Sequence, residues 1–121
     1  MSTNNAGFSL LEGKSLTPIA SLNPDLPNQA SCAVSGEVTI IWPFNSRTGL
    51  LAFRLTDRDA HRRRVQFHGS SAKAVAALNL RAGDLVAISL DGVEWIGSPA
   101  DWQLQFSEKV TLQVCAPTHP S

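Results

Sequence analysis

The sequence has 121 residues, of which 43% are hydrophobic, and its ten basic residues balance its ten acidic residues. This length and composition predict one domain with an apolar core and leave no room for a second domain. No apolar run approaches the length of about 18 residues that a membrane-spanning helix needs, and the first residues do not have the pattern of a signal peptide. We therefore expect a soluble, intracellular domain. Because its net charge is zero, a local patch would have to hold any nucleic acid.

The first part of the chain is expected to contain little regular structure. Residues 1–15 are polar and aperiodic, which predicts a disordered lead. Three closely spaced prolines follow, and they permit at most a short helical turn near Ile19–Leu22. The apolar residues of this segment are expected to pack against the body of the domain: Leu16, Ile19 and Leu22.

Alternating hydrophobicity predicts three strands, over residues 34–44, 50–57 and 64–68. In the first of them, Val38, Ile40 and Trp42 share one face. Gly36 is placed where this strand could bend, and Pro43 is expected to end it. The turn NSRTG then leads into the second strand, so the first two strands form a hairpin.

A helix is expected after the third strand, because the apolar spacing changes from two residues to the helical repeat beyond Gly69. It should run from about residue 71 to residue 80, with Ser70 or Ser71 as its N-cap. Gly69 would let the backbone turn between the strand and the helix.

The remaining strands are expected over residues 85–96 and 102–114. Asp91-Gly92 either kinks the first of these or splits it with a tight turn. Glu108 interrupts the alternation of the second, which predicts a bulge, bend or turn there. Residues 116–121 contain prolines and are expected to form a flexible tail.

The expected order is strand, strand, strand, helix, strand, strand. This is the order of the five-stranded Greek-key barrel known as the OB-fold, an all-β class with one capping helix. We therefore predict a single OB-fold domain over residues 16–115.

Five segments occur in order within residues 16–96: LTPIASLN, SGEVTIIWPF, FRLTD, VQFHGSSAKAV and AGDLVAISLDGVEW. Together they resemble the telomere single-strand DNA-binding OB domain of the Pot1 and Cdc13 type, most closely its filamentous-fungal versions. The resemblance implies a nuclear, non-enzymatic domain that binds G-rich telomeric single strands and acts with other telomere-capping proteins. It matches Phe67 to a base-stacking aromatic and Ile41-Trp42-Pro43 to the end of the first strand, where Ile41 replaces an aromatic.

A single-strand site needs flat side chains for the bases and guanidinium groups for the phosphates on one face. Polar residues of the second and third strands, with one arginine of the first turn, supply part of this face: Arg47, Arg54, Thr56, Arg64, Gln66 and His68. The aromatic candidates are Trp42, Phe44, Phe67 and Trp95. Strict alternation also fits a core position for Phe67 and Trp42, so both interpretations stay open. Phe44 could stack or cover a neighbouring side chain, and Trp95 could lie at the edge of the groove or in the core. Trp102 is expected in the core.

Metal and catalytic chemistry are not favoured. The histidines and cysteines do not follow a zinc-binding spacing: Cys32, His61, His68, Cys115 and His119. Ser70 and Lys73 form an S-x-x-K pattern, but the companion motifs of that chemistry are missing. We therefore expect no enzyme activity, no metal or other cofactor and no small-molecule substrate.

Two hypotheses about function remain. In the first, the domain binds single-stranded DNA. In the second, it is a protein-interaction OB domain of a telomere-capping or replication complex, with weak DNA binding or none. The arginines and aromatics favour the first hypothesis, and the neutral net charge favours the second.

Overall fold

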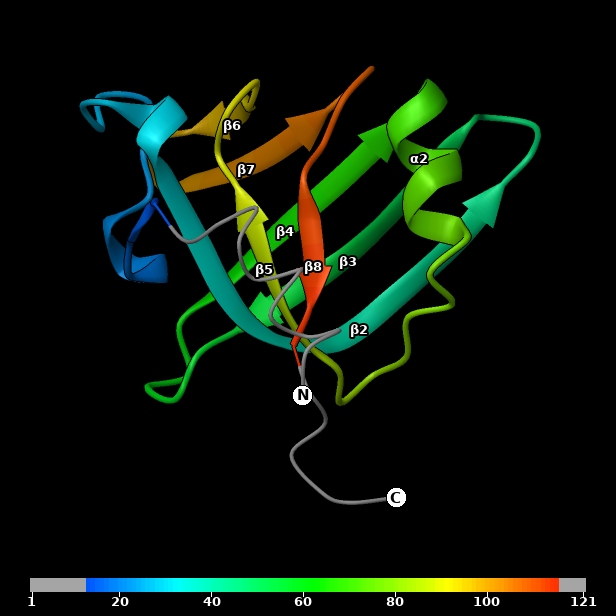
Figure 1. The fold of residues 1–121 in the computed structure, drawn as a ribbon, viewed down its shortest axis with the longest axis horizontal. Helices are drawn as coiled ribbons and strands as arrows, with labels where there is room; N and C mark the ends of the chain where they lie inside the picture. Colours follow the sequence, from blue (N-terminus) through cyan, green and yellow to red (C-terminus); the bar gives the residue numbers. More distant parts are fainter. Residues whose placement is uncertain (1–12, 116–121) are drawn as a thin grey trace.

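The computed structural model describes residues 13–115, which form one strongly curved sheet with helix α2 at one end (Figure 1). The strands are β1 (Ser15–Leu16), β2 (Cys32–Asn45), β3 (Leu50–Thr56), β4 (Arg62–His68), β5 (Leu85–Ser89), β6 (Glu94–Ser98), β7 (Asp101–Phe106) and β8 (Leu112–Val114). The helices are the 3₁₀ turns η1 (Ile19–Ser21) and η2 (Gln29–Ser31) and the α-helix α2 (Gly69–Ala76). Within this range, no helix has the length and hydropathy to cross a membrane. The predicted tail and residues 1–12 of the predicted lead lie outside the described residues.

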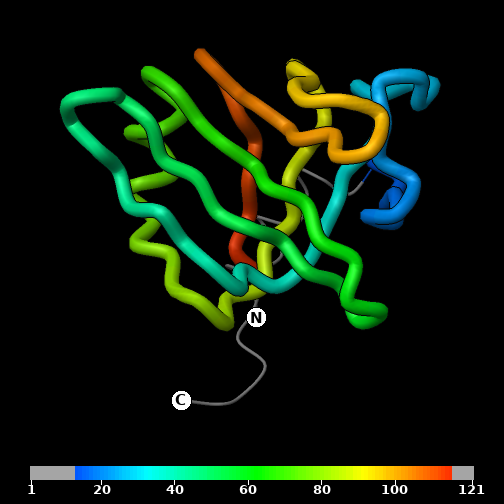
Figure 2. Tube along the Cα trace, turned by 180° about the vertical axis from the view of Figure 1, so that it is seen from behind, coloured from blue at the N-terminus to red at the C-terminus, as the bar shows by residue number. Residues whose placement is uncertain are grey.

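The sheet follows the path β6-β7-β4-β3-β2-β5-β8 and is not closed by hydrogen bonds at its two ends. Strands β2, β3 and β4 lie side by side in an antiparallel meander, which Figure 2 shows from behind. Strand β7 pairs with β4 in the parallel sense, and β5 pairs with β2 in the antiparallel sense. The predicted first, second and third strands therefore correspond to β2, β3 and β4.

The predicted fourth and fifth strands are each divided in two, yet they remain the two arms of one interrupted hairpin. Glu94 of β6 pairs with Gln105 of β7, and Ile88 of β5 pairs with Leu112 of β8. The turn at residues 91–92 separates β5 from β6, but it does not make a hairpin, because β5 pairs with β2 and β8 whereas β6 pairs with β7. The predicted break at Glu108 is confirmed, since it lies between β7 and β8.

The core is built around three phenylalanines. Phe67 lies 5.3 Å from Phe53 and 5.8 Å from Phe106, measured between ring centroids, and all three side chains are fully buried. Ile19 and Leu22 join this core, as predicted. The prediction for Leu16 is wrong, because β1 pairs with β2 through its backbone and leaves the Leu16 side chain 67% exposed.

A bulge in β2 changes which side chains face the core. Val38 pairs with Leu55, but the next pair joins Ile40 to Arg54, so Thr39 is an extra residue on β2. The predicted common face of Val38, Ile40 and Trp42 is therefore wrong: Val38 is buried, whereas Trp42 is 41% exposed. Strand β2 also continues to residue 45, past its predicted end at Pro43, because a second register shift between residues 42 and 45 accommodates the missing N–H.

Helix α2 starts directly after β4 and is shorter than predicted. Gly69 adopts a φ of +57°, a left-handed conformation that favours glycine and turns the chain into the helix. Neither Ser70 nor Ser71 caps the helix; the N-cap position is His68, which makes no side-chain capping bond. The buried Ser71 hydroxyl instead shares its hydrogen between the carbonyl oxygens of His68, at 2.9 Å, and Phe106, at 2.7 Å. Ser71 thus connects the helix to the ends of β4 and β7.

Replacement of Ser71 by alanine should lower the free energy of unfolding by about 0.5–1.5 kcal/mol, because a buried hydrogen bond is lost. Urea denaturation would measure the change. The control is Ser70→Ala, since Ser70 lies on the same turn and is exposed. Equal stability of the two variants would show that the Ser71 hydroxyl does not hold the helix on the sheet.

Candidate nucleic-acid interface

The convex side of the sheet carries a row of side chains that crosses five strands. In register they are Trp42 of β2, Ala52 of β3, Gln66 of β4, Gln105 of β7 and Glu94 of β6. Because alternate residues of a strand point to opposite faces, the two neighbours of Gln66 along β4 that share its face are at positions 64 and 68. We call this surface the outer face. It brings together the predicted polar residues of β3 and β4 and the predicted Trp42.

Trp42 and Arg64 form a contact on the outer face in which the Trp42 side chain is exposed. The Arg64 guanidinium carbon lies 4.5 Å from the centroid of the Trp42 ring, which is a cation–π contact. Beside them is a shallow groove of 260 Å³ whose lining includes Leu50 and Ala52. Ala52 is fully buried under its neighbours. A small side chain at this position leaves room for a flat group to lie against the indole ring.

A second group of side chains fixes Arg54 next to this groove. The Arg54 Nε–H donates to Thr39 Oγ1 at 3.2 Å, and Thr39 Oγ1 lies 2.9 Å from Thr56 Oγ1. Thr39 is the extra residue of the bulge, so the irregularity of β2 supplies the acceptor that holds Arg54. The predicted site residues Arg54 and Thr56 therefore lie together, half-buried, on the outer face.

A chain of hydrogen bonds runs from Arg64 across three strands. Arg64 Nε donates to Gln66 Oε1 at 3.4 Å, and Gln66 Nε2 donates to Gln105 Oε1 at 2.7 Å. Gln105 Nε2 then donates to Glu94 Oε1 at 2.7 Å. His68 Nε2 also lies 3.0 Å from Gln105 Oε1. The guanidinium at one end and the carboxylate at the other fix the orientation of both amides, so the polar atoms of the outer face are held in place before any ligand arrives.

The charge on this surface is uneven. Arg54, Arg62 and Arg64 come from β3 and β4, and none of them forms an ion pair with a carboxylate within residues 13–115. Arg47, the candidate from the first turn, is exposed between β2 and β3. Glu94 gives the β6 side of the same face a negative charge. The phosphate backbone of a nucleic acid would therefore lie over β3 and β4 rather than over β6.

Phe67 is not available to a base, so its assignment to the site is wrong. Its exposed fraction is 0%, and it stacks on Phe106 with an interplanar angle of 17°. The strict alternation of β4 holds to its last residue, which keeps position 67 on the same face as Val65. The side chain therefore contributes to the core and has no free ring face.

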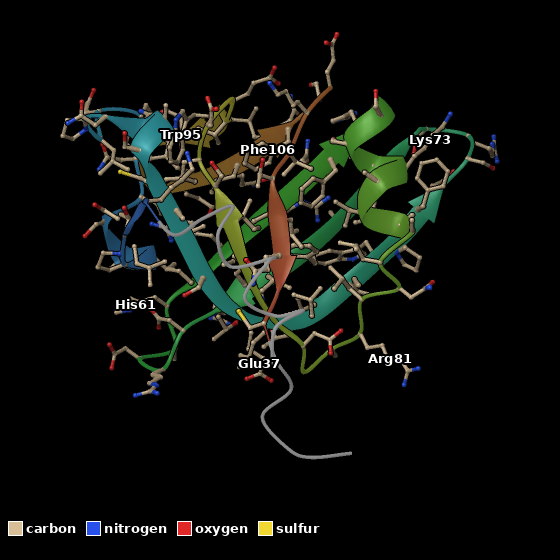
Figure 3. The ribbon with its side chains drawn as sticks, viewed as in Figure 1. Glu37, His61, Lys73, Arg81, Trp95 and Phe106 are labelled. Carbon is tan, nitrogen blue, oxygen red and sulfur yellow. The ribbon has the colours of Figure 1, made fainter. Side chains whose placement is uncertain are left out.

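Two further aromatics lie away from the outer face, which corrects their assignment. Phe44 is half-buried and lines a groove beside α2, together with Val75 and Leu80. Trp95 packs against the core, and its Nε1–H donates to Gln29 Oε1 at 3.1 Å; Figure 3 shows it near the start of β2. Both side chains cover the core where the strand faces change at a bulge or turn.

Four residues of the interface were missed by the sequence analysis: Thr39, Arg62, Glu94 and Gln105. Gln105 carried a usable signal, because it lies on the polar side of the last predicted alternation, and the parallel pairing of β7 with β4 brings it next to Gln66. Thr39 carried none, since the hydrophobic pattern does not reveal the bulge.

The turn between β3 and β4 gathers two carboxylates and a histidine, whose potential ligand atoms lie within 4.8 Å of one another: Asp57, Asp59 and His61. Burial raises the pKa of Asp57, but hydrogen bonds from the backbone N–H groups of His61 and Asp59, together with the His61 side chain, outweigh it and lower the pKa below its ordinary value. The contribution of Asp57 to stability is thus present above its unfolded-state pKa and is lost as the pH falls through the lowered pKa. These internal bonds account for the grouping, and we assign no metal to it.

The topology and the outer face together define an OB-fold domain, as predicted. Two solved OB domains are similar to this chain. One, from Thermoplasma acidophilum, has a TM-score of 0.56 and 17% identity over 88% of this chain and 92% of that chain. The other, from Methanosarcina mazei, has a TM-score of 0.56 and 15% identity over 88% of this chain and 87% of that chain. At these identities the likeness establishes the fold and does not assign a ligand.

The chain belongs to the family described as Domain of unknown function (DUF8502), whose profile matches residues 13–120. No curated protein matches the sequence.

Proposed function

We propose that this domain binds single-stranded nucleic acid on its outer face, without being an enzyme. The observation that carries the proposal is the exposed Trp42 ring, which lies against Arg64 beside the groove over Ala52. Base stacking needs an accessible aromatic face, and phosphates need a nearby cation that is not neutralised by a carboxylate. Arg54, Arg62 and Arg64 supply these cations.

We further propose that the ligand is G-rich telomeric DNA, bound in the nucleus together with telomere-capping proteins, as the sequence resemblance implies. One feature of the outer face supports a guanine preference. Glu94 holds a carboxylate at the end of the hydrogen-bond chain, where Oε1 accepts from Gln105 and from Ser107 Oγ. The Watson–Crick edge of guanine presents two adjacent N–H donors, which match the geometry of a carboxylate.

A protein partner is the second candidate, and two observations favour it. The net charge is zero, and the groove beside α2 that contains Phe44 is lined mainly by apolar side chains, with a volume of 350 Å³. A peptide that filled this groove would leave the outer face free. The protein-interaction hypothesis predicts weak DNA binding or none, so binding experiments with DNA separate the two candidates.

The test is fluorescence anisotropy with a labelled G-rich telomeric strand, a pyrimidine strand of equal length and a duplex, each at two salt concentrations. We expect the protein to bind the G-rich strand best and the duplex least. Arg64→Ala should weaken binding and reduce the salt slope by about 0.7, which corresponds to one phosphate of a single strand.

The matched control is Arg81→Ala, since Arg81 is exposed and extends away from the sheet, as Figure 3 shows. This variant should bind like the wild-type protein. Binding of every strand more weakly than about 100 µM, the weak end of non-specific binding, would refute the nucleic-acid proposal and favour the protein partner. Equal affinity for the G-rich and pyrimidine strands would refute only the guanine preference.

A further inference from the structure

A pocket separate from the two grooves lies at the far end of β4 from α2, between residues 20–25 and the turn that joins β6 to β7. Figure 2 shows the two segments next to each other, the first in blue and the second in yellow and orange. The volume of the pocket is 510 Å³, within the range of small-molecule sites. Its walls include Leu22, Pro24, Pro99 and Trp102. Trp102 was expected in the core, but it is only half-buried and lines this pocket instead.

Two opposite charges line the same pocket without pairing with each other. Arg63 has one hydrogen bond within the described residues, from Nη1 to the carbonyl oxygen of Arg62 at 2.8 Å, and its buried Nε has no partner. Asp25 is exposed, and its carboxylate forms no ion pair within residues 13–115. Since buried polar groups are normally satisfied, the guanidinium has hydrogen-bonding capacity that the free protein does not use.

This combination of groups restricts what can occupy the pocket. Asp25 disfavours a phosphate or an acidic peptide, and a purely apolar side chain would leave both charges unused. A nucleobase has two apolar faces for Trp102 and the prolines, and its edge carries both acceptors and donors for Arg63 and Asp25. The lining therefore fits a single unstacked base.

The pocket adjoins the outer face at the start of β4, because consecutive residues of a strand point to opposite faces. Arg63 points toward the inner side, but its neighbours Arg62 and Arg64 belong to the outer face. Val65 and Leu104 are paired in parallel register, and Arg63 and Trp102 each precede one of these two residues by two positions. Arg63 and Trp102 therefore lie at the same end of the two strands, where both line the pocket. Seven residues of β4 span about 23 Å, which several nucleotides would cover within the usual site size of about 4–16.

We propose that this pocket holds the base at one end of the bound strand, an inference that rests on the proposed binding of single strands by the outer face. The strand would lie over Arg64 and Arg62, and its last base would turn past the first residue of β4, Arg62, into the pocket. The protein would thus recognise one terminus of the nucleic-acid strand in addition to the length of that strand.

The test compares a labelled ten-nucleotide single strand with two versions that lack the base at the 5′ or at the 3′ terminal position. We expect removal of the base at one of the two ends to weaken binding to the wild-type protein about tenfold, the range of one base–aromatic stack. Asp25→Asn and Arg63→Gln should bind the intact strand more weakly and should be insensitive to the missing base. The controls Asp101→Asn and Arg81→Gln make the same changes outside the pocket, so they should behave like the wild-type protein.

A second readout is the indole N–H resonance of Trp102, which can be assigned with the Trp102→Phe variant. It should shift when the intact strand is added and stay in place with the version that lacks the critical base. If the intact strand binds but neither missing base changes the affinity or this shift, the inference is overturned and the proposed function stands. If no single strand binds at all, both are overturned.

Discussion

Replacement of Phe67 by alanine is expected to lower the free energy of unfolding by about 3–5 kcal/mol, the range for a buried phenylalanine. The side chain is fully buried between Phe53 and Phe106, so truncation leaves a cavity at the centre of the core. Domains of this kind are stable by only about 5–15 kcal/mol, so a large part of the stability would be lost. Urea denaturation followed by circular dichroism measures the effect.

DNA binding by the folded fraction of this variant distinguishes the core role from the stacking role. At low temperature and without denaturant, we expect that fraction to bind a single strand as the wild-type protein does. Phe67→Leu, which fills more of the space, should recover much of the stability. Normal stability combined with weak binding would mean that a base reaches Phe67 after all.

Trp42→Ala is expected to have the opposite profile. The affinity for a single strand should fall by about 1–3 kcal/mol, because one stacking surface is removed and Arg64 loses its aromatic partner. Stability should change little, since the Trp42 side chain is 41% exposed and packs on the outside of the sheet. Fluorescence anisotropy and thermal denaturation of the same preparation measure the two quantities.

The control for this variant is Trp42→Phe, which keeps a flat ring at the same position. It should retain most of the affinity that alanine loses. Full affinity of Trp42→Ala would contradict the location of the stacking surface, and a large fall in its melting temperature would assign the indole to packing.

The fold could be predicted because the sequence patterns that indicate its strands, helix and breaks are local. Alternation along β3 and β4, the change of period after Gly69 and the break at Glu108 each depend on a few neighbouring residues. The order of these elements then selected the OB-fold. The shorter helix was less predictable, because Ser71 hydrogen-bonds to the carbonyl of Phe106 instead of capping the helix, and Phe106 is distant in the sequence.

The candidate site could be predicted only where a strand keeps its alternation. Arg54, Arg64 and Gln66 lie on the expected face because β3 and β4 are regular. Trp42 could not be assigned, since the bulge reverses the faces of β2 between positions 38 and 41. Glu94 was missed because β6 joins the outer face only through the pairing of β7 with β4, which connects residues far apart in the sequence.

The extra residue at position 39 affects how relatives of this chain should be compared. If one residue were deleted from the bulge, every later side chain of β2 would move to the opposite face, and the residue aligned with Trp42 would point into the core. Two family members could then carry the same aromatic in an ungapped alignment and still present different surfaces to a ligand. The length of this segment, counted from Val38, therefore decides whether an aromatic near its end is part of the interface.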